Sequence, residues 1–357
     1  MASLAPPSRH VLVVGGAGYI GSHMVKALRD AGQRTTVFDN LSSGHRDAVL
    51  GGDFVHGDLA DPLALEMLFA GRQFDAVMHF AGSIQVGESV SNPCRYYANN
   101  VTNTLNLLAT MTRHGVNKLV FSSTAAIFGE PQHLPISESH PTQPLNPYGR
   151  GKLMVEQILA DFDRAYGLKS ACLRYFNAAG ADPSGLIGER HEPETHLIPI
   201  ALEVAAGQRS HLAIHGKDYD TPDGTCIRDY IHVNDLAQAH LLALEALCQG
   251  QASMALNLGN GQGFSVQEVI DAVRAVTGHA IPTLYSPRRA GDPARLIADS
   301  RQARQQLGWT PQYPQLHDIV RHAWHFCQRR EQAALHQQAF YAHYAAPSPI
   351  FHAKATA

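Results

Sequence analysis

The chain has 357 residues, of which 45% are hydrophobic and 17% are charged. This length predicts two domains, or one large α/β domain with a smaller one attached. The 28 basic and 31 acidic side chains give a formal net charge of −3. That balance argues against a strongly basic nucleic-acid-binding surface, and the ordinary apolar content argues against intrinsic disorder.

The five cysteines are scattered and form no C-x-x-C pair, which argues against a zinc knuckle and against a disulfide framework. The first ten residues carry no signal-peptide pattern, and no segment approaches the ~18 consecutive apolar residues of a membrane helix. We therefore expect a soluble, cytoplasmic protein that binds neither nucleic acid nor membranes.

Twenty-one histidines raise the question of a metal site. His322 and His325 share the face of a predicted helix, but no carboxylate or cysteine stands at ligand spacing beside them. We expect solvated surface histidines there and no bound metal.

Short β-branched apolar runs alternate with helical periods through the first half of the chain. The alternation indicates a parallel sheet covered by helices on both faces, an α/β doubly wound Rossmann sheet. The predicted strands are 10–15, 34–39, 74–80, 118–123 and 170–177, and the predicted helices are 20–31, 62–71, 94–114 and 150–166.

After about residue 180 the pattern changes. Residues 180–196 are rich in Gly, Pro, His and Asp, which indicates a boundary or an active-site loop. The residues after this loop predict a smaller mixed α/β substrate domain, with helices 197–207, 234–249 and 265–277 and strands 254–258 and 283–285. We expect a mainly Rossmann domain over 1–180, a mainly substrate-binding domain over 181–330 with some of the chain crossing back, and a tail over 331–357.

A glycine-rich turn, GGAGYIGSH, follows the first predicted strand and opens the first predicted helix. Gly15, Gly18 and Gly21 lack a Cβ, so the backbone can approach a pyrophosphate at the start of the helix; a tight structural turn is the alternative. Asp39 ends the next strand, 18 residues after Gly21, where a carboxylate accepts hydrogen bonds from ribose hydroxyls and repels a 2′-phosphate. This favours NAD over NADP. Asp58 is a candidate adenine contact, or a cap of the following helix.

Tyr148 and Lys152 lie four residues apart in NPYGRGK, where Asn146 and Pro147 predict a helix start that puts both side chains on one face. A surface helix is the alternative. An ammonium about 6 Å from a phenol, at an effective dielectric near 20, lowers the phenol's pKa by roughly 2. Tyr148 is therefore a candidate general base, with Lys152 as its partner and as a ligand of the nicotinamide ribose. Thr124 lies just after the fourth predicted strand. Its hydroxyl either shares the proton of the reacting substrate oxygen or has only the structural role of a Ser/Thr turn.

These strings together resemble the extended short-chain dehydrogenase/reductase family, in its branch of NAD-dependent sugar-nucleotide epimerases. The similarity covers about residues 10–325 and includes HFAG, VGESV, FSST, RYFNAAGADPSG, HLIP, DYDTPDGTCIRDYIHV, LNLGNG and PRRAGDPARLIAD. The resemblance implies tightly held NAD, a homodimer, and reversible C4 epimerisation of UDP-glucose and UDP-galactose through a transient 4-keto sugar and bound NADH. The alternatives are another UDP-sugar (a UDP-N-acetylhexosamine or a UDP-pentose) and a non-catalytic nucleotide-binding relative.

The resemblance also implies a role for individual residues. Tyr148 would be the base, Lys152 its electrostatic partner and Thr124 the third catalytic residue. The implied cofactor-binding residues are Gly15, Gly18, Tyr19, Ile20, Gly21, Asp39, Asn40, Asp58, Leu59, Phe80, Ala81, Gly82, Asn99, Ser122, Tyr148, Lys152 and Tyr175. The implied substrate-binding residues are Thr124, Tyr148, Asn177, His196 and Leu197 (near the uracil), Ala213, His215, Tyr230, Leu296, and Arg228, Arg289 and Asp292 (on the diphosphate and ribose).

The chain departs from the family at a few positions. Thr124 stands where many members carry Ser, and Ile84 stands where some carry a Lys that contacts the NAD phosphates. Ala125 and Ala126 replace the Asp-Glu pair of the related 4,6-dehydratases, so dehydration is not expected. Leu296 stands where members carry either a bulky aromatic or a small residue. Its intermediate size predicts that UDP-glucose and UDP-galactose are accepted and leaves UDP-N-acetylhexosamines open.

Overall fold

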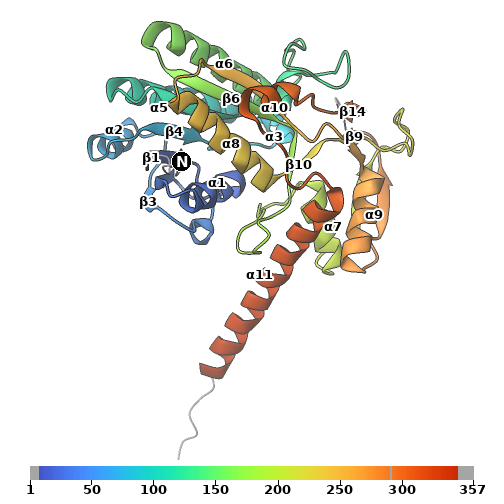
Figure 1. Cartoon of the computed structure of the whole chain (residues 1–357). Helices are drawn as coiled ribbons and strands as arrows, with labels where there is room; N and C mark the ends of the chain where they lie inside the picture. Colours follow the sequence, from blue (N-terminus) through green and yellow to red (C-terminus); the bar gives the residue numbers. More distant parts are fainter. Residues whose placement is uncertain (1–7, 290–291, 345–357) are drawn as a thin grey trace, which may run out of the picture.

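A seven-stranded parallel sheet forms the centre of the computed structural model, which describes residues 8–289 and 292–344 (Figure 1). The strand order is β11-β6-β5-β4-β1-β2-β3, which contains the Rossmann order 3-2-1-4-5-6 and confirms the predicted fold class. The strands are β1 (His10–Val14), β2 (Arg34–Asp39), β3 (Asp53–His56), β4 (Ala76–His79), β5 (Lys118–Thr124), β6 (Lys169–Tyr175) and β11 (Met254–Leu258).

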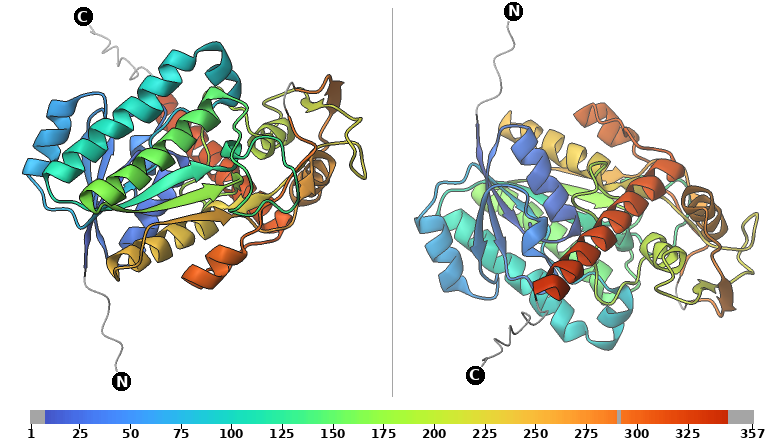
Figure 2. Two further views of the ribbon diagram at one scale, coloured as in Figure 1. Left: turned by 90° about the horizontal axis from the view of Figure 1, so that it is seen from above. Right: turned by 90° about the horizontal axis from the view of Figure 1, so that it is seen from below.

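Helices cover both faces of this sheet (Figure 2). Strand β1 shows why: Val11 and Val13 face one apolar core, and Leu12 and Val14 face the other, because successive side chains of a strand point to opposite sides. The first core is closed by α1 (Tyr19–Asp30) and α8 (Val233–Cys248), and the second by α2 (Pro62–Ala70), α5 (Asn103–Arg113) and α6 (Pro147–Tyr166).

The predicted helix 94–114 is not one regular helix. The chain forms α3 (Val86–Ser91), α4 (Pro93–Tyr97), a π-helical turn over Ala98–Thr102, and then α5. The prediction of a continuous α-helix was therefore wrong in the middle, where the π turn adds one residue per turn. Such turns occur often at functional sites.

A smaller layer lies beside the sheet and is built from short strand pairs and three helices. Helices α7 (Leu197–Ala205), α9 (Val266–Thr277) and α11 (Leu316–Tyr344) enclose its apolar core. The strand groups are β7 (Asn177–Ala179) with β10 (Tyr230–His232), β8 (Leu212–His215) with β13 (Thr283–Ser286), and β12 (Phe264–Ser265) with β9 (Ile227–Arg228) and β14 (Arg295–Leu296).

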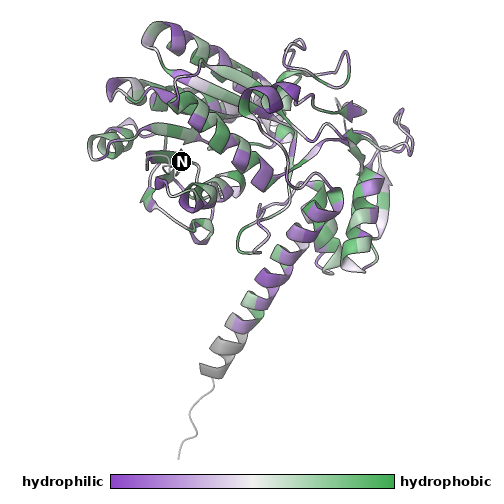
Figure 3. Cartoon of the chain, viewed as in Figure 1, coloured by the Kyte–Doolittle hydropathy of each residue, from purple (hydrophilic) through white to green (hydrophobic). Residues whose placement is uncertain are grey.

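Parts of the second half of the chain return to the large sheet. Strand β11 pairs with β6, helix α8 packs against α1, and α10 (Arg301–Leu307) packs against α8. The second half of α11 extends away from the body of the molecule (Figure 1), and the part of this half that Figure 3 colours is mainly hydrophilic. Residues 331–344 of the predicted tail continue this helix, and 345–357 lie outside the described residues.

Across residues 8–289 and 292–344, none of the helices combines the length and the apolar character that crossing a membrane requires.

Many histidines are buried. The expectation of a solvated surface histidine is wrong for His322, which is 4% exposed and whose Nδ1 lies 3.0 Å from Nε2 of the buried His232. The reason is tertiary: the face of α11 that carries His322 packs against β10, which ends at His232. His325, one turn further on, is exposed as expected.

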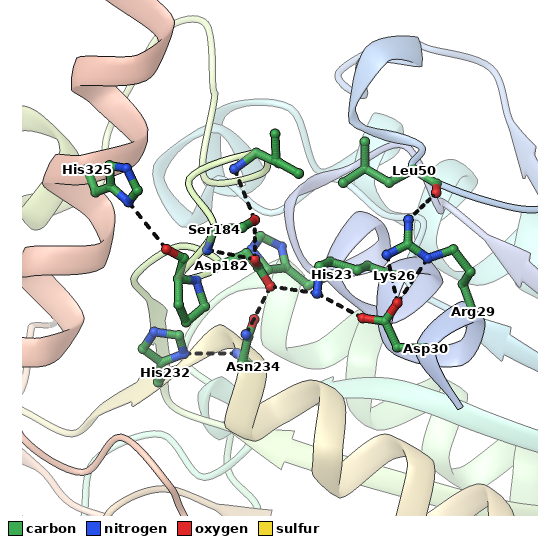
Figure 4. A network of polar contacts seen from close by, with 12 residues as sticks. His23, Lys26, Arg29, Asp30, Leu50, Asp182, Ser184, His232, Asn234 and His325 are labelled. Carbon is green, nitrogen blue, oxygen red and sulfur yellow. Dashed lines mark hydrogen bonds and ion pairs between the residues drawn. The ribbon is translucent and has the colours of Figure 1, made fainter. Parts of the chain in front are cut away.

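A polar network centred on Asp182 joins α1, α8 and the loop after β7 (Figure 4). Its carboxylate accepts hydrogen bonds from the Ser184 backbone N–H at 3.0 Å and from Asn234 Nδ2 at 3.1 Å. Lys26 Nζ lies 3.2 Å from the same carboxylate. The network therefore fixes this loop beside the helix that follows the glycine-rich turn.

Candidate functional site

The glycine-rich turn connects β1 to α1. Gly15 has φ +77°, and a Cβ there would lie 2.4 Å from the Ala81 backbone nitrogen. A Cβ at Gly21 would lie 2.1 Å from the Gly15 carbonyl oxygen, whereas one at Gly18 would meet only that oxygen, at an ordinary 3.4 Å. The protein's own packing therefore requires Gly15 and Gly21, while Gly18 leaves open space at the start of a helix.

The start of α1 offers donors to a ligand in that space. Gly18 is the N-cap and supplies no side-chain hydrogen bond, so the first backbone N–H groups, at Tyr19 and Ile20, remain available to an anion. The Tyr19 hydroxyl donates to the Gly180 carbonyl at 2.7 Å and ties the helix to the loop after β7. The turn thus fits the pyrophosphate of a dinucleotide.

Polar side chains end β2 and follow β3. Asp39 ends β2 and accepts a hydrogen bond from the Ala17 N–H at 2.9 Å, so its carboxylate lies beside the glycine-rich turn. Asn40 donates to Asp58 at 2.7 Å, which joins the two strand ends. Helix α2 is capped by Asp61, so the role of helix cap does not account for Asp58.

The segment after β4 consists of Phe80, Ala81 and Gly82. A Cβ on the last of them would lie 3.3 Å from Asn100 Oδ1 and 3.7 Å from Lys152 Nζ. Asn100 lies in the π turn and accepts a hydrogen bond from the Ser83 N–H at 2.8 Å, and Asn99 donates to the Ser83 hydroxyl at 3.1 Å. The sequence did not single out Asn100, because a π turn leaves no clear mark in the spacing of apolar residues. Leu59 is buried nearby, and its carbonyl accepts from the Asn106 side chain.

Tyr148 and Lys152 lie on the first two turns of α6, which begins at the predicted proline. A Cβ at Gly149 would lie 2.5 Å from the Ala126 carbonyl oxygen, so this helix approaches the chain after β5 as closely as backbones allow. The contact brings the Tyr148 phenol to the Thr124 side chain, with which it interacts. The three predicted catalytic side chains are therefore neighbours at the carboxyl end of β5.

Lys152 is a buried cation, 4% exposed. Its Nζ donates to the Ser122 carbonyl at 2.8 Å, and the Ser122 hydroxyl is hydrogen-bonded to the Tyr175 hydroxyl at the end of β6. Burial lowers the pKa of Lys152 to about 8, and the carboxylate of Glu156, one turn further along α6, acts to raise it. Lys152 therefore remains mostly protonated at pH 7.

The surroundings of the Tyr148 phenol shift its pKa in two opposing ways. Burial raises the pKa of the phenol above its ordinary value, and the interaction with Thr124 acts to lower it. Burial disfavours the phenolate because it removes a charged group from water. The lowering of this pKa by the ammonium of Lys152 stays a prediction.

A group of charged and polar side chains lies where β9 and β14 pair. Arg228 is buried and forms an ion pair with Asp292, and Leu296 is opposite Arg228 in the strand pairing. Burial lowers the pKa of His215, and the charge of Arg289 lowers it further, so these two also lie close together. Five predicted substrate-binding residues thus belong to one neighbourhood.

Leu296 connects this neighbourhood to the catalytic side chains. It packs against the apolar cluster formed by Ala125, Ile127, Phe128 and Ile136, and Ala125 directly follows Thr124.

The other predicted substrate residues lie on four elements. Asn177 opens β7, where its N–H donates to the Asp229 carbonyl at 3.0 Å. Tyr230, its partner in β10, is buried in the core of the smaller layer. Ala213 on β8 is exposed, and Leu197 is the first residue of α7.

His196 is the N-cap of α7, and its Nδ1 contacts the carboxylate of Glu189. Glu194 and His191 lie beside this pair. The group was not predicted from the sequence, although the spacing E-x-H-x-x-E-x-H over residues 189–196 was a signal for it.

The chain is similar to proteins of one family. The model of the NAD dependent epimerase/dehydratase family matches residues 11–259. A relative from Halalkalibacterium halodurans, named UDP-glucose 4-epimerase, is 56% identical over 316 residues, which are 88% of this chain and 95% of that protein.

Two solved structures share the fold at substantial identity. UDP-glucose 4-epimerase from Brucella ovis in complex with NAD has a TM-score of 0.87 and 49% identity, over 89% of this chain and 98% of that one. The UDP-Glc/GlcNAc 4-epimerase from Campylobacter jejuni has a TM-score of 0.79 and 46% identity, over 90% of this chain and 100% of that one.

Proposed function

This chain belongs to the NAD dependent epimerase/dehydratase family, and we propose that it interconverts UDP-glucose and UDP-galactose by reversible inversion at C4 of the hexose. The observation that carries the proposal is the meeting of Thr124, Tyr148 and Lys152 at the carboxyl end of β5, next to the glycine-rich turn. Relatives named for this activity align over nearly their whole length.

NAD is the cofactor, in keeping with the family to which the chain belongs. The glycine-rich turn and the donors at the start of α1 fit its pyrophosphate, and Asp39 suits the hydroxyls of its adenosine ribose. The residues proposed to bind it are Gly15, Gly18, Tyr19, Ile20, Gly21, Asp39, Asn40, Asp58, Leu59, Phe80, Ala81, Gly82, Asn99, Ser122, Tyr148, Lys152 and Tyr175.

In the proposed mechanism Tyr148 removes the proton of the sugar 4-hydroxyl, and Thr124 shares that hydrogen bond. Lys152, a buried cation, stabilises the phenolate as the proton leaves the sugar. NAD, when bound, would supply a reversible hydride acceptor whose oxidised nicotinamide ring carries a positive charge. Tyr148 returns the proton when the hydroxyl forms again with the opposite configuration.

Inversion requires that the UDP part is held firmly while the 4-keto sugar turns over. Arg228 and Arg289 offer guanidinium groups to the diphosphate, and Asp292 offers a carboxylate to the ribose. His196 and Leu197, at the start of α7, are the proposed uracil contacts. Asn177, Ala213, His215, Tyr230 and Leu296 complete the proposed substrate site.

UDP-N-acetylglucosamine is the second candidate substrate. Leu296 packs against the apolar cluster that includes Ala125, the residue after Thr124, and we propose that its size limits the room beside the reacting carbon. Leucine is smaller than an aromatic side chain, and the similar Campylobacter jejuni protein is named for both sugars.

Three coarser features belong to the same proposal. We assign residues 1–180 mainly to the NAD-binding domain, together with α8 and β11, which pack on the large sheet, and the remainder up to 330 mainly to the UDP-sugar domain. The homodimer implied by the family resemblance is tested by sedimentation equilibrium. The five free thiols fit a reducing compartment such as the cytoplasm.

The test is incubation of the purified protein with UDP-galactose and no added redox partner, followed by proton NMR. We expect UDP-glucose to accumulate to equilibrium, with no deuterium entering C4 in heavy water because the hydride never leaves the site. The same assay is run with UDP-N-acetylglucosamine and a UDP-pentose. Turnover of one of these without turnover of UDP-galactose would refute the assignment.

A further inference from the structure

Two glutamates and two histidines converge in the loop that precedes α7. Glu189, His191, Glu194 and His196 each offer one potential ligand atom, and these four atoms all lie within 4.8 Å of one another. We propose that this His₂Glu₂ cluster binds one Zn²⁺ ion with a structural role.

The distances suit a tetrahedral ion. His191 Nδ1 lies 3.2 Å from Glu189 Oε1 and 3.8 Å from Glu194 Oε1, and His196 Nδ1 lies 3.9 Å from Glu194 Oε1 and in contact with Glu189. Zinc bonds of about 2.0–2.2 Å to nitrogen and oxygen place tetrahedral ligands about 3.3 Å apart. Coordination would therefore require the two contacts of Glu194 to shorten by about half an ångström and the contact between His196 and Glu189 to lengthen.

The two buried carboxylates of the cluster need positive charge beside them, which either protonated histidines or a metal ion can supply. The Glu189 and Glu194 side chains are each only 5% exposed, and within residues 8–289 and 292–344 neither forms an ion pair with lysine or arginine. His191 Nδ1 is buried and lies 3.2 Å from Glu189 Oε1 without the geometry of a hydrogen bond. One Zn²⁺ would balance both carboxylates and would be a better-aligned partner for this nitrogen.

The donor set favours zinc over calcium or magnesium. Two imidazole nitrogens do not suit these hard cations, which prefer oxygen ligands, whereas imidazole together with carboxylate suits Zn²⁺. The carboxylate of Glu194 is held in place by the backbone of the next two residues, because its Oε1 accepts the N–H groups of Thr195 and His196 at 2.8 and 2.9 Å.

The place of the ion explains what it would do. All four ligands come from eight consecutive residues that end at the N-cap of α7, so the ion would fix the loop between β7 and that helix. The ring centroid of His191 lies 6.4 Å from that of Tyr19, at the start of α1. Zinc would therefore hold the smaller layer beside the glycine-rich turn, and His196 would be the one ligand that it shares with the proposed uracil site.

The test counts tight zinc sites on the full-length protein with its NAD, after removal of metal by a chelator. ZnCl₂ is titrated at pH 7.5 against a chromogenic chelator, and thermal unfolding is followed in parallel. The variants are His191→Ala and Glu189→Gln. The matched control is His114→Ala, which breaks a surface histidine–glutamate pair with 2.8 Å between Nε2 and Oε2 of Glu66.

We expect one tight equivalent and a higher Tm with zinc in the wild type and in His114→Ala, and at least 100-fold weaker binding in the two cluster variants. X-ray absorption of the zinc-loaded wild type should show two imidazoles and two oxygens, which decides the question even if a cluster variant fails to fold. Zinc binding in the wild type no tighter than in His191→Ala, or a sulfur shell in the spectrum, would overturn the proposal and leave protonated histidines as the partners of the two carboxylates.

Discussion

Gly18→Ala and Gly21→Ala together distinguish a glycine required for NAD binding from one required for the stability of the fold. Gly18 has φ −76° and ψ 175°, which alanine adopts freely, and the new Cβ would meet only one oxygen, at 3.4 Å. Alanine is a poorer N-cap than glycine, so we expect the free energy of unfolding to fall by at most about 1 kcal/mol. The methyl group would, however, stand where the NAD pyrophosphate approaches, so NAD affinity should fall at least 10-fold, or about 1.4 kcal/mol.

Gly21→Ala is the contrasting variant. Its Cβ would lie 2.1 Å from the Gly15 oxygen, and the turn must open by about 1.3 Å to restore a 3.4 Å contact. Such overpacking costs about 1–3 kcal/mol, so this variant should lose stability as well as NAD.

The assays are urea unfolding and fluorescence titration with NAD. Gly71→Ala, whose Cβ meets only an oxygen at 3.5 Å at the end of α2, controls for the added methyl group and should change neither. NAD affinity of wild-type strength in Gly18→Ala would refute the role given to the turn.

Three further predictions concern catalysis, specificity and acid stability. Lys152→Met removes the buried cation that donates to the Ser122 carbonyl, so kcat should fall at least about 100-fold; an unchanged kcat would exclude Lys152 from the mechanism. Leu296→Tyr should lower kcat/KM for UDP-N-acetylglucosamine at least about tenfold relative to UDP-glucose, because the larger ring fills the space beside the catalytic residues; an equal ratio in both proteins would contradict this. Burial acts to raise the pKa of the Asp182 carboxyl. Hydrogen bonds, first from Ser184, outweigh that effect and lower the pKa to about 2. Its contribution of about 2 kcal/mol is therefore present above pH ~4 and lost as the pH falls toward 2. Asp182→Asn should lower the free energy of unfolding at pH 7 by that amount and flatten its decline between pH 4 and 2 in urea titrations; an equally steep decline would refute the assignment.

Most of the large sheet could be predicted because its signals are local. A strand such as 10–14 is apolar at every position after the first, since both faces are covered, and the turn after it carries its glycines within seven residues. The π turn over Ala98–Thr102 was missed because one extra residue barely changes the apolar spacing of a helix.

The candidate site also combines features that the local sequence predicts with features that depend on tertiary packing. Tyr148 and Lys152 are adjacent on one helical face, so their proximity follows from the sequence, but the direction of the Tyr148 pKa depends on burial, which the sequence does not contain. His322 likewise has a partner 90 residues away, His232. Such pairings arise only from the packing of distant elements.

The most direct test of the central claim is the turnover of UDP-galactose by Tyr148→Phe with its NAD content measured in the same sample. We predict that bound NAD is unchanged, because the ring remains, and that turnover falls about 10²–10⁴-fold, the range typical of a lost general base. Turnover near that of the wild type, with NAD bound, would contradict the claim that this phenol moves the sugar proton.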